Sequence, residues 1–183
     1  MVKPRVIAIV GMPGAGKSLV SRVAQSRGIP ILVCGDVIRE EAMRRGLQPT
    51  PGNMAEVMLT IRQQEGLGVV AERLIPKIER SGSSLVVVEG VRSMAEVNAL
   101  RKRSGVTILG IHASPNTRYE RLRARGRTDD PENWEEFQER DMRELNVGIG
   151  DVISLADRML INESEERDLE AASGLMLTEM TQE

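Results

Sequence analysis

Cysteine, histidine and aromatic side chains are scarce in this chain of 183 residues, which contains one cysteine, one histidine, and one each of tryptophan, tyrosine and phenylalanine. The lone cysteine, Cys34, excludes an internal disulfide and any cysteine-based zinc site, which suits a reducing cytosol. Because aromatic rings are so few, the core has to be aliphatic. The predicted strands therefore offer no platform on which single-stranded nucleic acid could stack.

The chain also lacks a large excess of charge and any long hydrophobic run. Its formal net charge is -2, so no overall basic field would recruit nucleic acid or an anionic membrane surface. No apolar segment approaches the ~20 residues that cross a bilayer, and no signal-peptide pattern is recognised. We expect a cytoplasmic protein without a membrane partner, and the sequence predicts no oligomeric state.

Short apolar runs alternate with helical patterns along the chain, which is typical of a doubly wound parallel α/β sheet covered on both faces. The length fits one domain over residues 1–183. One helix is expected to begin at Asn53, with Glu56 as its capping partner. The five predicted strands are 6–10, 31–33, 85–88, 107–111 and 159–161, and further helices are predicted from residue 17 to before Gly28 and over about 93–103, 115–125 and 166–181.

Two segments do not fit the plain alternation of strands and helices. Residues 36–80 separate the second and third strands by far more chain than a tight crossover needs, and we interpret them as an acceptor-binding insertion. Residues 126–136 are polar and contain glycine, aspartates and proline, and we interpret them as a lid.

The strongest motif is a G-x-x-x-x-G-K-S loop directly after the first predicted strand. Such a loop can wrap backbone N–H groups around phosphates at the start of a helix. Lys17 would neutralise the β- and γ-phosphates of ATP, and the Ser18 hydroxyl would ligate magnesium. The predicted ATP-binding loop consists of Gly11, Met12, Pro13, Gly14, Ala15, Gly16, Lys17 and Ser18.

An acidic residue and an arginine follow the third predicted strand. Glu89 comes directly after the aliphatic run 85–88, a position that suits a carboxylate beside magnesium; the alternative is a helix-capping or salt-bridging acid. Arg92 lies three residues later and is expected to touch an acceptor phosphate.

Arginines are concentrated in the second half of the chain. Phosphoryl transfer needs positioned positive charge around its transition state, and the arginine fork supplies it. Arg121 and Arg125 are four residues apart on one predicted helix face, with Arg127 just beyond and Arg140 on the helix after the lid. We expect residues 101–127 to form one local anion trap, although a solvated basic face is the alternative. The trap has eight basic residues against Glu120: Arg101, Lys102, Arg103, Arg118, Arg121, Arg123, Arg125 and Arg127.

Asp36 closes the second predicted strand, and Arg39 follows one helical turn later. Both should face the ligand crevice, because the carboxyl ends of parallel strands line it. Asp36 is either a helix N-cap or an acid near an acceptor hydroxyl, and these residues alone do not separate the two roles.

Together these segments resemble the nucleoside monophosphate kinase group of P-loop kinases, and in particular an archaeal set of adenylate-kinase-related proteins often compared with dephospho-coenzyme A kinases. The sequence Arg-Thr-Asp-Asp at 127–130 is similar to the lid signature of adenylate kinases. The resemblance implies that Arg121 lies against the ATP adenine and that Arg125, Arg127 and Arg140 clamp the transferred phosphate. It further implies that two more residues, Arg39 and Arg92, hold the acceptor phosphate.

The chain departs from adenylate kinases in its acceptor half. Residues 89–92 read Glu-Gly-Val-Arg, one residue shorter than the adenylate kinase segment, and Glu96 stands where a glutamine would read the acceptor adenine. The stretch 36–39 also resembles dephospho-coenzyme A kinases, in which the aspartate would activate a ribose hydroxyl. We expect a kinase that transfers the γ-phosphoryl group of MgATP to a nucleotide-like acceptor, most simply a nucleoside monophosphate. The alternatives are a dephospho-coenzyme A kinase and a nucleotide-dependent assembly factor, for which the basic stretch 101–127 could serve RNA.

Overall fold

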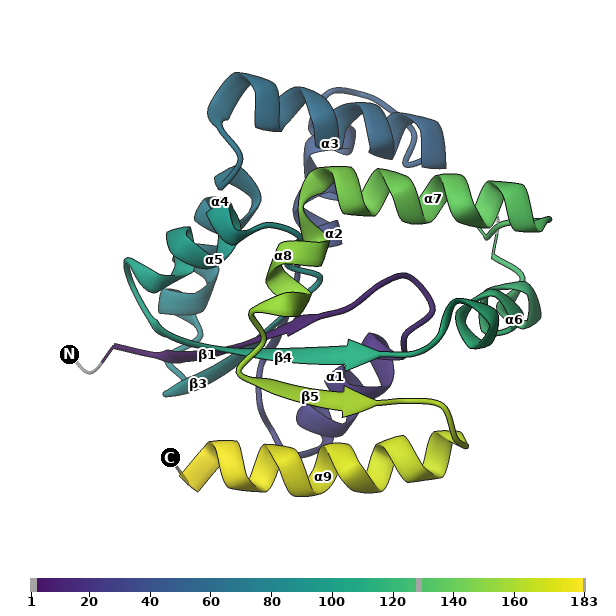
Figure 1. Cartoon of the computed structure of the whole chain (residues 1–183). Helices are drawn as coiled ribbons and strands as arrows, with labels where there is room; N and C mark the ends of the chain where they lie inside the picture. Colours follow the sequence, from purple (N-terminus) through teal and green to yellow (C-terminus); the bar gives the residue numbers. More distant parts are fainter. Residues whose placement is uncertain (1–2, 128–129, 183) are drawn as a thin grey trace.

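The computed structural model describes residues 3–127 and 130–182. Its centre is a parallel sheet with strand order β2-β3-β1-β4-β5 (Figure 1). All five predicted strands are confirmed, with ends that differ by at most two residues. The strands are β1 (Arg5–Val10), β2 (Ile31–Val33), β3 (Leu85–Glu89), β4 (Gly105–His112) and β5 (Arg158–Ile161).

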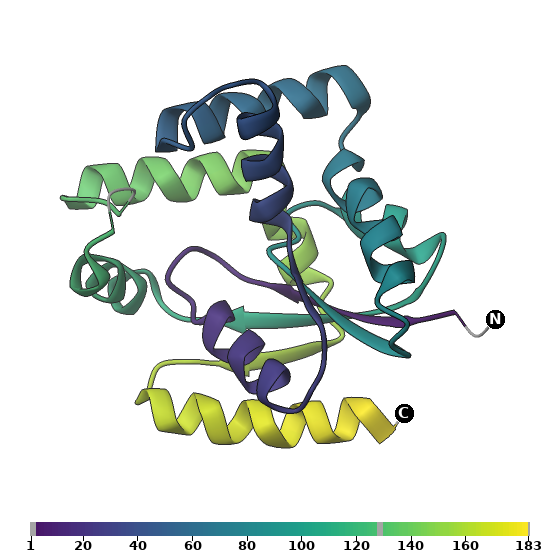
Figure 2. The same cartoon turned by 180° about the vertical axis from the view of Figure 1, so that it is seen from behind.

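Helices cover both faces of this sheet, as the alternating pattern predicts. Side chains of β1 alternate between the faces: Ile7 and Ile9 pack with α1 and α9, whereas Val6 and Ala8 pack with the remaining core helices. Figures 1 and 2 show α1 and α9 together on one side of the sheet. The helices are α1 (Lys17–Ser26), α2 (Cys34–Arg44), α3 (Pro51–Glu65), α4 (Val69–Arg80), α5 (Met94–Arg101), α6 (Pro115–Arg125), α7 (Trp134–Val147), α8 (Ile149–Ser154) and α9 (Glu166–Gln182).

Two helix starts differ from the sequence interpretation. Helix α2 begins at Cys34, directly after β2, and its N-cap is Val33, so Asp36 lies inside the first turn and is not an N-cap. Helix α3 has Thr50 as its N-cap, and the Thr50 hydroxyl accepts a hydrogen bond from the Asn53 N–H at 3.3 Å. The capping box at Asn53 was therefore misplaced by one turn, because Thr50 offers the same chemistry earlier in the chain.

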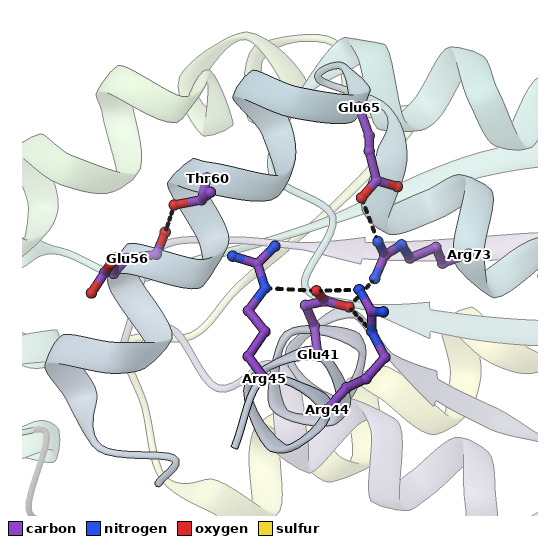
Figure 3. Close-up of polar contacts among 7 residues, drawn as sticks. All are labelled: Glu41, Arg44, Arg45, Glu56, Thr60, Glu65 and Arg73. Atoms are coloured by element: carbon purple, nitrogen blue, oxygen red, sulfur yellow. Dashed lines mark hydrogen bonds and ion pairs between the residues drawn. The ribbon is translucent and has the colours of Figure 1, made fainter. Parts of the chain in front are cut away.

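The insertion consists of α2, α3 and α4, and a buried carboxylate ties it together (Figure 3). Glu41 on α2 is 1% exposed and accepts hydrogen bonds from Arg44, Arg45 and Arg73 at 2.7 to 2.9 Å. Arg73 on α4 also donates to Glu65 on α3 at 2.6 Å. Hydrogen bonds, first of all those from Arg44, hold the pKa of Glu41 well below its usual range. We call Glu41, Arg44, Arg45, Glu65 and Arg73 the insertion cluster.

The three aromatic side chains join α6 to α7. The ring of Tyr119 lies 5.2 Å from that of Trp134 and 5.5 Å from that of Phe137, between ring centroids. The expectation of an aliphatic core elsewhere is confirmed, because the two core clusters on the sheet are built from valine, isoleucine, leucine, alanine and methionine with Cys34. Within residues 3–127 and 130–182, no helix has both the length and the apolar character needed to cross a bilayer.

Candidate active site

A pocket of about 570 Å³ lies at the carboxyl end of the sheet. It is where the glycine-rich loop of residues 11–18, called the P-loop from here on, meets the end of β3, α6, α7 and the segment between β5 and α9. Its position is the one expected for ligands of parallel α/β sheets. The lining residues are Gly11, Pro13, Gly14, Gly16, Lys17, Ser18, Leu19, Arg22, Glu89, Gly90, Arg92, Arg121, Leu122, Arg125, Arg127, Arg140, Glu144, Ile149, Asn162, Ser164, Glu166 and Leu169.

The P-loop is shaped by glycines that have no room for a side chain. Gly14 and Gly16 have φ values of 81° and 105°, in the left-handed region. A Cβ on Gly14 would lie 2.8 Å from the carbonyl oxygen of Arg118, and a Cβ on Gly16 would meet the Asn162 amide. The loop is thus packed against α6 and the end of β5, and this packing fixes the backbone that would receive phosphates.

Lys17 opens α1 and folds back over the loop. Its Nζ donates to the carbonyl oxygens of Gly11 at 2.7 Å and Met12 at 3.1 Å. Burial is the main cause that lowers the pKa of Lys17 to about 8; Glu144 and Glu89 oppose this shift, whereas the guanidinium groups of Arg92 and Arg140 add to it. The ammonium group remains charged near neutral pH and is held beside the space that a phosphate chain would occupy.

Glu89 is the last residue of β3 and lines the pocket with Ser18. The carboxylate of Glu89 accepts a hydrogen bond from the Ser21 hydroxyl at 2.6 Å. Ser21 lies one turn after Ser18 on α1, so the Ser18 hydroxyl shares the same helix face. A hydroxyl and a carboxylate oxygen suit magnesium, which takes one or two protein ligands and completes its shell with water and substrate phosphates. Among the described residues, no group of three or more histidine, cysteine, aspartate or glutamate side chains is arranged to hold a metal.

The four arginines predicted to surround the donor phosphates all line the pocket: Arg121, Arg125, Arg127 and Arg140. Arg125 and Arg140 contact the buried carboxylate of Asp130, at 2.9 and 3.3 Å. Burial of this carboxyl favours its neutral form, but hydrogen bonds from Arg125 and the Arg127 backbone, together with the charges of Arg125 and Arg140, outweigh that effect and lower the pKa of Asp130. The predicted lid also includes residues 128 and 129, which lie outside the described residues.

Arg121 organises the segment that follows β5. Its guanidinium donates to the carbonyl oxygens of Asn162 at 3.0 Å and Ser164 at 3.1 Å. The Asn162 side chain in turn donates to the carbonyl oxygen of Ala15 in the P-loop at 2.9 Å. Asn162 and Ser164 were not predicted, because no local motif marks them and only the packing of β5 beside β4 brings them to the loop.

Arg92 also lines the pocket, as predicted, and it has a partner that sequence reasoning missed. Its Nε lies 2.7 Å from Oε2 of Glu144 on α7. The available signal was the spacing of Arg140 and Glu144, which are four residues apart and so share one face of α7.

Three predicted acceptor-site residues do not line the pocket. Asp36 is ion-paired with Arg39 on the half-exposed surface of α2. Glu96 is fully buried, where it forms an ion pair with Arg62 of α3 at 2.6 Å and accepts a hydrogen bond from the Arg92 backbone at 2.7 Å. This position does not fit the expectation that Glu96 contacts an acceptor, because both carboxylate oxygens are engaged inside the fold. Of the loop residues, Met12 and Ala15 also lie outside the lining.

The basic stretch 101–127 is not one surface. Residues 101–103 precede the amino end of β4, whereas Arg121, Arg125 and Arg127 follow its carboxyl end, eight residues further along the strand direction. Arg118 is 4% exposed and forms a paired contact with Asp141 of α7 at 2.8 and 2.5 Å. The expectation of a single anion trap was therefore wrong, since the strand separates its two halves.

Sequence comparison places the chain beside known proteins. Residues 10–138 match the family described as the AAA domain. A UPF0200 protein of Hyperthermus butylicus is 48% identical over 176 residues, covering 96% of this chain and 95% of the relative. A UPF0200 protein of Pyrococcus horikoshii is 50% identical over 164 residues, covering 86% of this chain and 87% of the relative.

Solved structures with the same fold include small-molecule kinases. A shikimate kinase from Bacteroides thetaiotaomicron aligns with a TM-score of 0.64 at 16% identity, covering 98% of this chain and 99% of that chain. A shikimate kinase from Acinetobacter baumannii in complex with shikimate aligns with a TM-score of 0.58 at 19% identity, covering 97% and 96%. At these identities the likeness shows the fold alone, which is that of P-loop kinases.

Proposed function

The chain belongs to the UPF0200 family and carries an AAA domain with a P-loop kinase-like fold, and from that premise we propose that it is an ATP-dependent phosphotransferase. It transfers the γ-phosphoryl group of MgATP to a small nucleotide-like acceptor that carries a phosphate, most simply a nucleoside monophosphate. The observation that carries this proposal is the convergence of Lys17 and Ser18 with arginines from three separate segments on one pocket.

The donor half would work mainly by positioning charge. Lys17 and the P-loop N–H groups would hold the β- and γ-phosphates, with Ser18 and Glu89 beside the metal. Bound magnesium would supply neutralisation of the charge shared by these phosphates. Arg125, which lines the pocket and donates a hydrogen bond to Asp130, would stabilise charge that develops on the transferred group.

The acceptor half would be built around Arg92. Its planar guanidinium can bind two phosphate oxygens at once and keeps its charge when water is excluded. Arg92 follows β3 directly, and its backbone N–H is anchored by the buried Glu96. The chain would therefore hold the acceptor phosphate next to the donor phosphates, within the same pocket.

The dephospho-coenzyme A kinase alternative would need Asp36 to approach an acceptor hydroxyl. Asp36 lies outside the pocket lining and is paired with Arg39, which favours a phosphate acceptor held by Arg92. Asp36→Asn separates these proposals: it would abolish transfer and spare ATP binding under the hydroxyl mechanism, and would change transfer less than threefold under ours.

The direct test is to incubate the protein with MgATP and a panel of acceptors and to identify products by mass. The panel contains nucleoside monophosphates, dephospho-coenzyme A and short RNA, and Lys17→Ala is the inactive control. A phosphorylated nucleotide made by the wild type and not by the control is the expected result. ATP hydrolysis without any phosphorylated product would overturn the proposal in favour of an assembly factor.

A further inference from the structure

Glu144 is a carboxylate inside a pocket whose charged lining residues are mostly cations. The two other acids of the lining have partners of their own: Glu89 is bound by Ser21, and Glu166 pairs with Arg22 at an exposed position. Glu144 is only 15% exposed and faces Arg92. The seven cations of the lining are Lys17, Arg22, Arg92, Arg121, Arg125, Arg127 and Arg140.

The contact between Glu144 and Arg92 is close but incomplete. Oε2 of Glu144 is buried and, among the described residues, receives no directed hydrogen bond, although Nε of Arg92 lies 2.7 Å away. A carboxylate oxygen without a directed donor is held less firmly than an oxygen in a paired guanidinium–phosphate contact. The structure therefore contains an anion at Arg92 that a better anion can replace.

We propose that Glu144 is a specificity-determining residue that occupies Arg92 until the phosphate of the acceptor displaces it. The inference rests on the proposed function in one respect, which is that Arg92 belongs to the acceptor half. A carboxylate fixed to α7 is present at high effective concentration, so a free monoanion competes poorly with it. A phosphate monoester brings a second charge and a third oxygen, so it binds the Arg92 guanidinium more strongly than the Glu144 carboxylate does.

The position of Glu144 on α7 gives the displacement a consequence. Glu144 and Arg140 share one face of this helix, and Arg140 lies close enough to Lys17 to lower its pKa. An acceptor that displaces Glu144 from Arg92 would thus act on the helix face that also carries Arg140, a cation of the donor half.

The test measures anion binding and does not depend on turnover. Inorganic phosphate is titrated calorimetrically into protein saturated with MgADP, so that the P-loop is filled. Glu144→Gln is expected to lower the Kd for phosphate about tenfold, because one competing charge at short range is lost. The preference of the Glu144→Gln variant for phosphate over acetate is expected to fall, since a monoanion such as acetate no longer competes with the Glu144 carboxylate for Arg92. Arg92→Gln should remove phosphate binding.

The matched control is Glu139→Gln, which removes the same charge from an exposed position of α7, where the side chain is 73% exposed. Glu144→Ala is the second variant and should change the Kd in the same direction. An unchanged Kd in Glu144→Gln, an equal gain in Glu139→Gln, or no phosphate binding to any folded protein would overturn the proposal. MgADP is first titrated into each protein in the same instrument, so that a failure of nucleotide binding, which would contradict the proposed function, is seen separately.

Discussion

The pocket and the insertion cluster both contain arginines and glutamates, but their charges are arranged for different roles. In the insertion cluster three arginines point at Glu41, which is 1% exposed, and Arg73 is shared with Glu65. In the pocket seven cations face three acids, and the arginines border open space of about 570 Å³. An arginine cluster built around a buried acid stabilises a fold, whereas one with too few acids around a cavity is prepared for an anionic ligand.

The two arrangements differ in how the free-energy cost of burying a charge is offset. The buried carboxylate of Glu41 is compensated within the protein, so the three helices of the insertion are held as one body. The buried ammonium of Lys17 is not compensated in the same way, and its lowered pKa records that cost. A bound anionic ligand would offset the cost of burying the Lys17 ammonium.

The largest expected effect follows removal of Lys17. Lys17→Ala is expected to reduce turnover on the order of a thousandfold, because a charge on the transferring phosphate is lost. The free protein should not lose thermal stability, since the buried ammonium is a cost in the folded state. Steady-state kinetics and thermal unfolding measure the two effects, and near-normal turnover would contradict the assignment of the donor half.

Removal of Glu41 should have the opposite pattern. Glu41→Ala is expected to lower the free energy of unfolding by about 2 kcal/mol, less than for a fully enclosed ion pair because its arginines can reach water. The Kd for ATP should stay unchanged. Urea unfolding and nucleotide titration read both quantities, with the exposed Glu65→Ala as a milder comparison. Equal stability of Glu41→Ala and wild type would show that the insertion cluster does not stabilise the fold.

The same residue sets the expected acid sensitivity. The folded-state pKa of Glu41 is depressed below its ordinary value of 4.5. Its contribution to stability is therefore fully present above about pH 4.5 and is lost as the pH falls toward the depressed pKa. Unfolding free energies measured across this range should fall more steeply in wild type than in Glu41→Gln.

Nucleotide affinity should depend on pH on the alkaline side. Lys17 has a pKa of about 8 in the free protein, and ATP binds the protonated form. As the pH rises above 8, the affinity for ATP should fall by up to about tenfold per pH unit. Lys17→Arg keeps its charge and should show a flat profile over this range. Calorimetric titrations in buffers of different ionisation enthalpy would detect the accompanying proton uptake.

The smallest effect is expected at the amino end of β4. Replacing residues 101–103 by alanine should leave ATP affinity within about twofold of wild type, because surface charges beyond a Debye length are screened. Arg127→Ala, at the other end of the strand, should weaken ATP binding about tenfold, as expected for a lost phosphate contact. An equal effect of both changes would restore the single anion trap that the structure separates.

Much of the donor half could be read from local patterns. A P-loop after a buried strand specifies its own geometry, since its glycines, Lys17 and Ser18 are fixed by the strand, loop and helix order. Arg121 and Arg125 were found through helical spacing, and Glu89 through its place at the end of a strand. The acceptor half was harder, because Asp36 was assigned from its place after a strand and Glu96 from motif resemblance, and the contacts of both depend on which helix packs beside them.

The sequence by itself determined the parallel sheet, the positions of its strands along the chain and the phosphate-binding loop, because alternating apolar periodicity and a glycine-rich motif act over short stretches of chain. Only the tertiary structure decided which charges meet. Glu96 pairs with Arg62 across 34 residues, Arg121 reaches Asn162 across 41, and Glu144 reaches Arg92 through the return of α7 over the pocket. A charge is committed to stability or left for a ligand by the partners that packing supplies, and no local pattern carries that information.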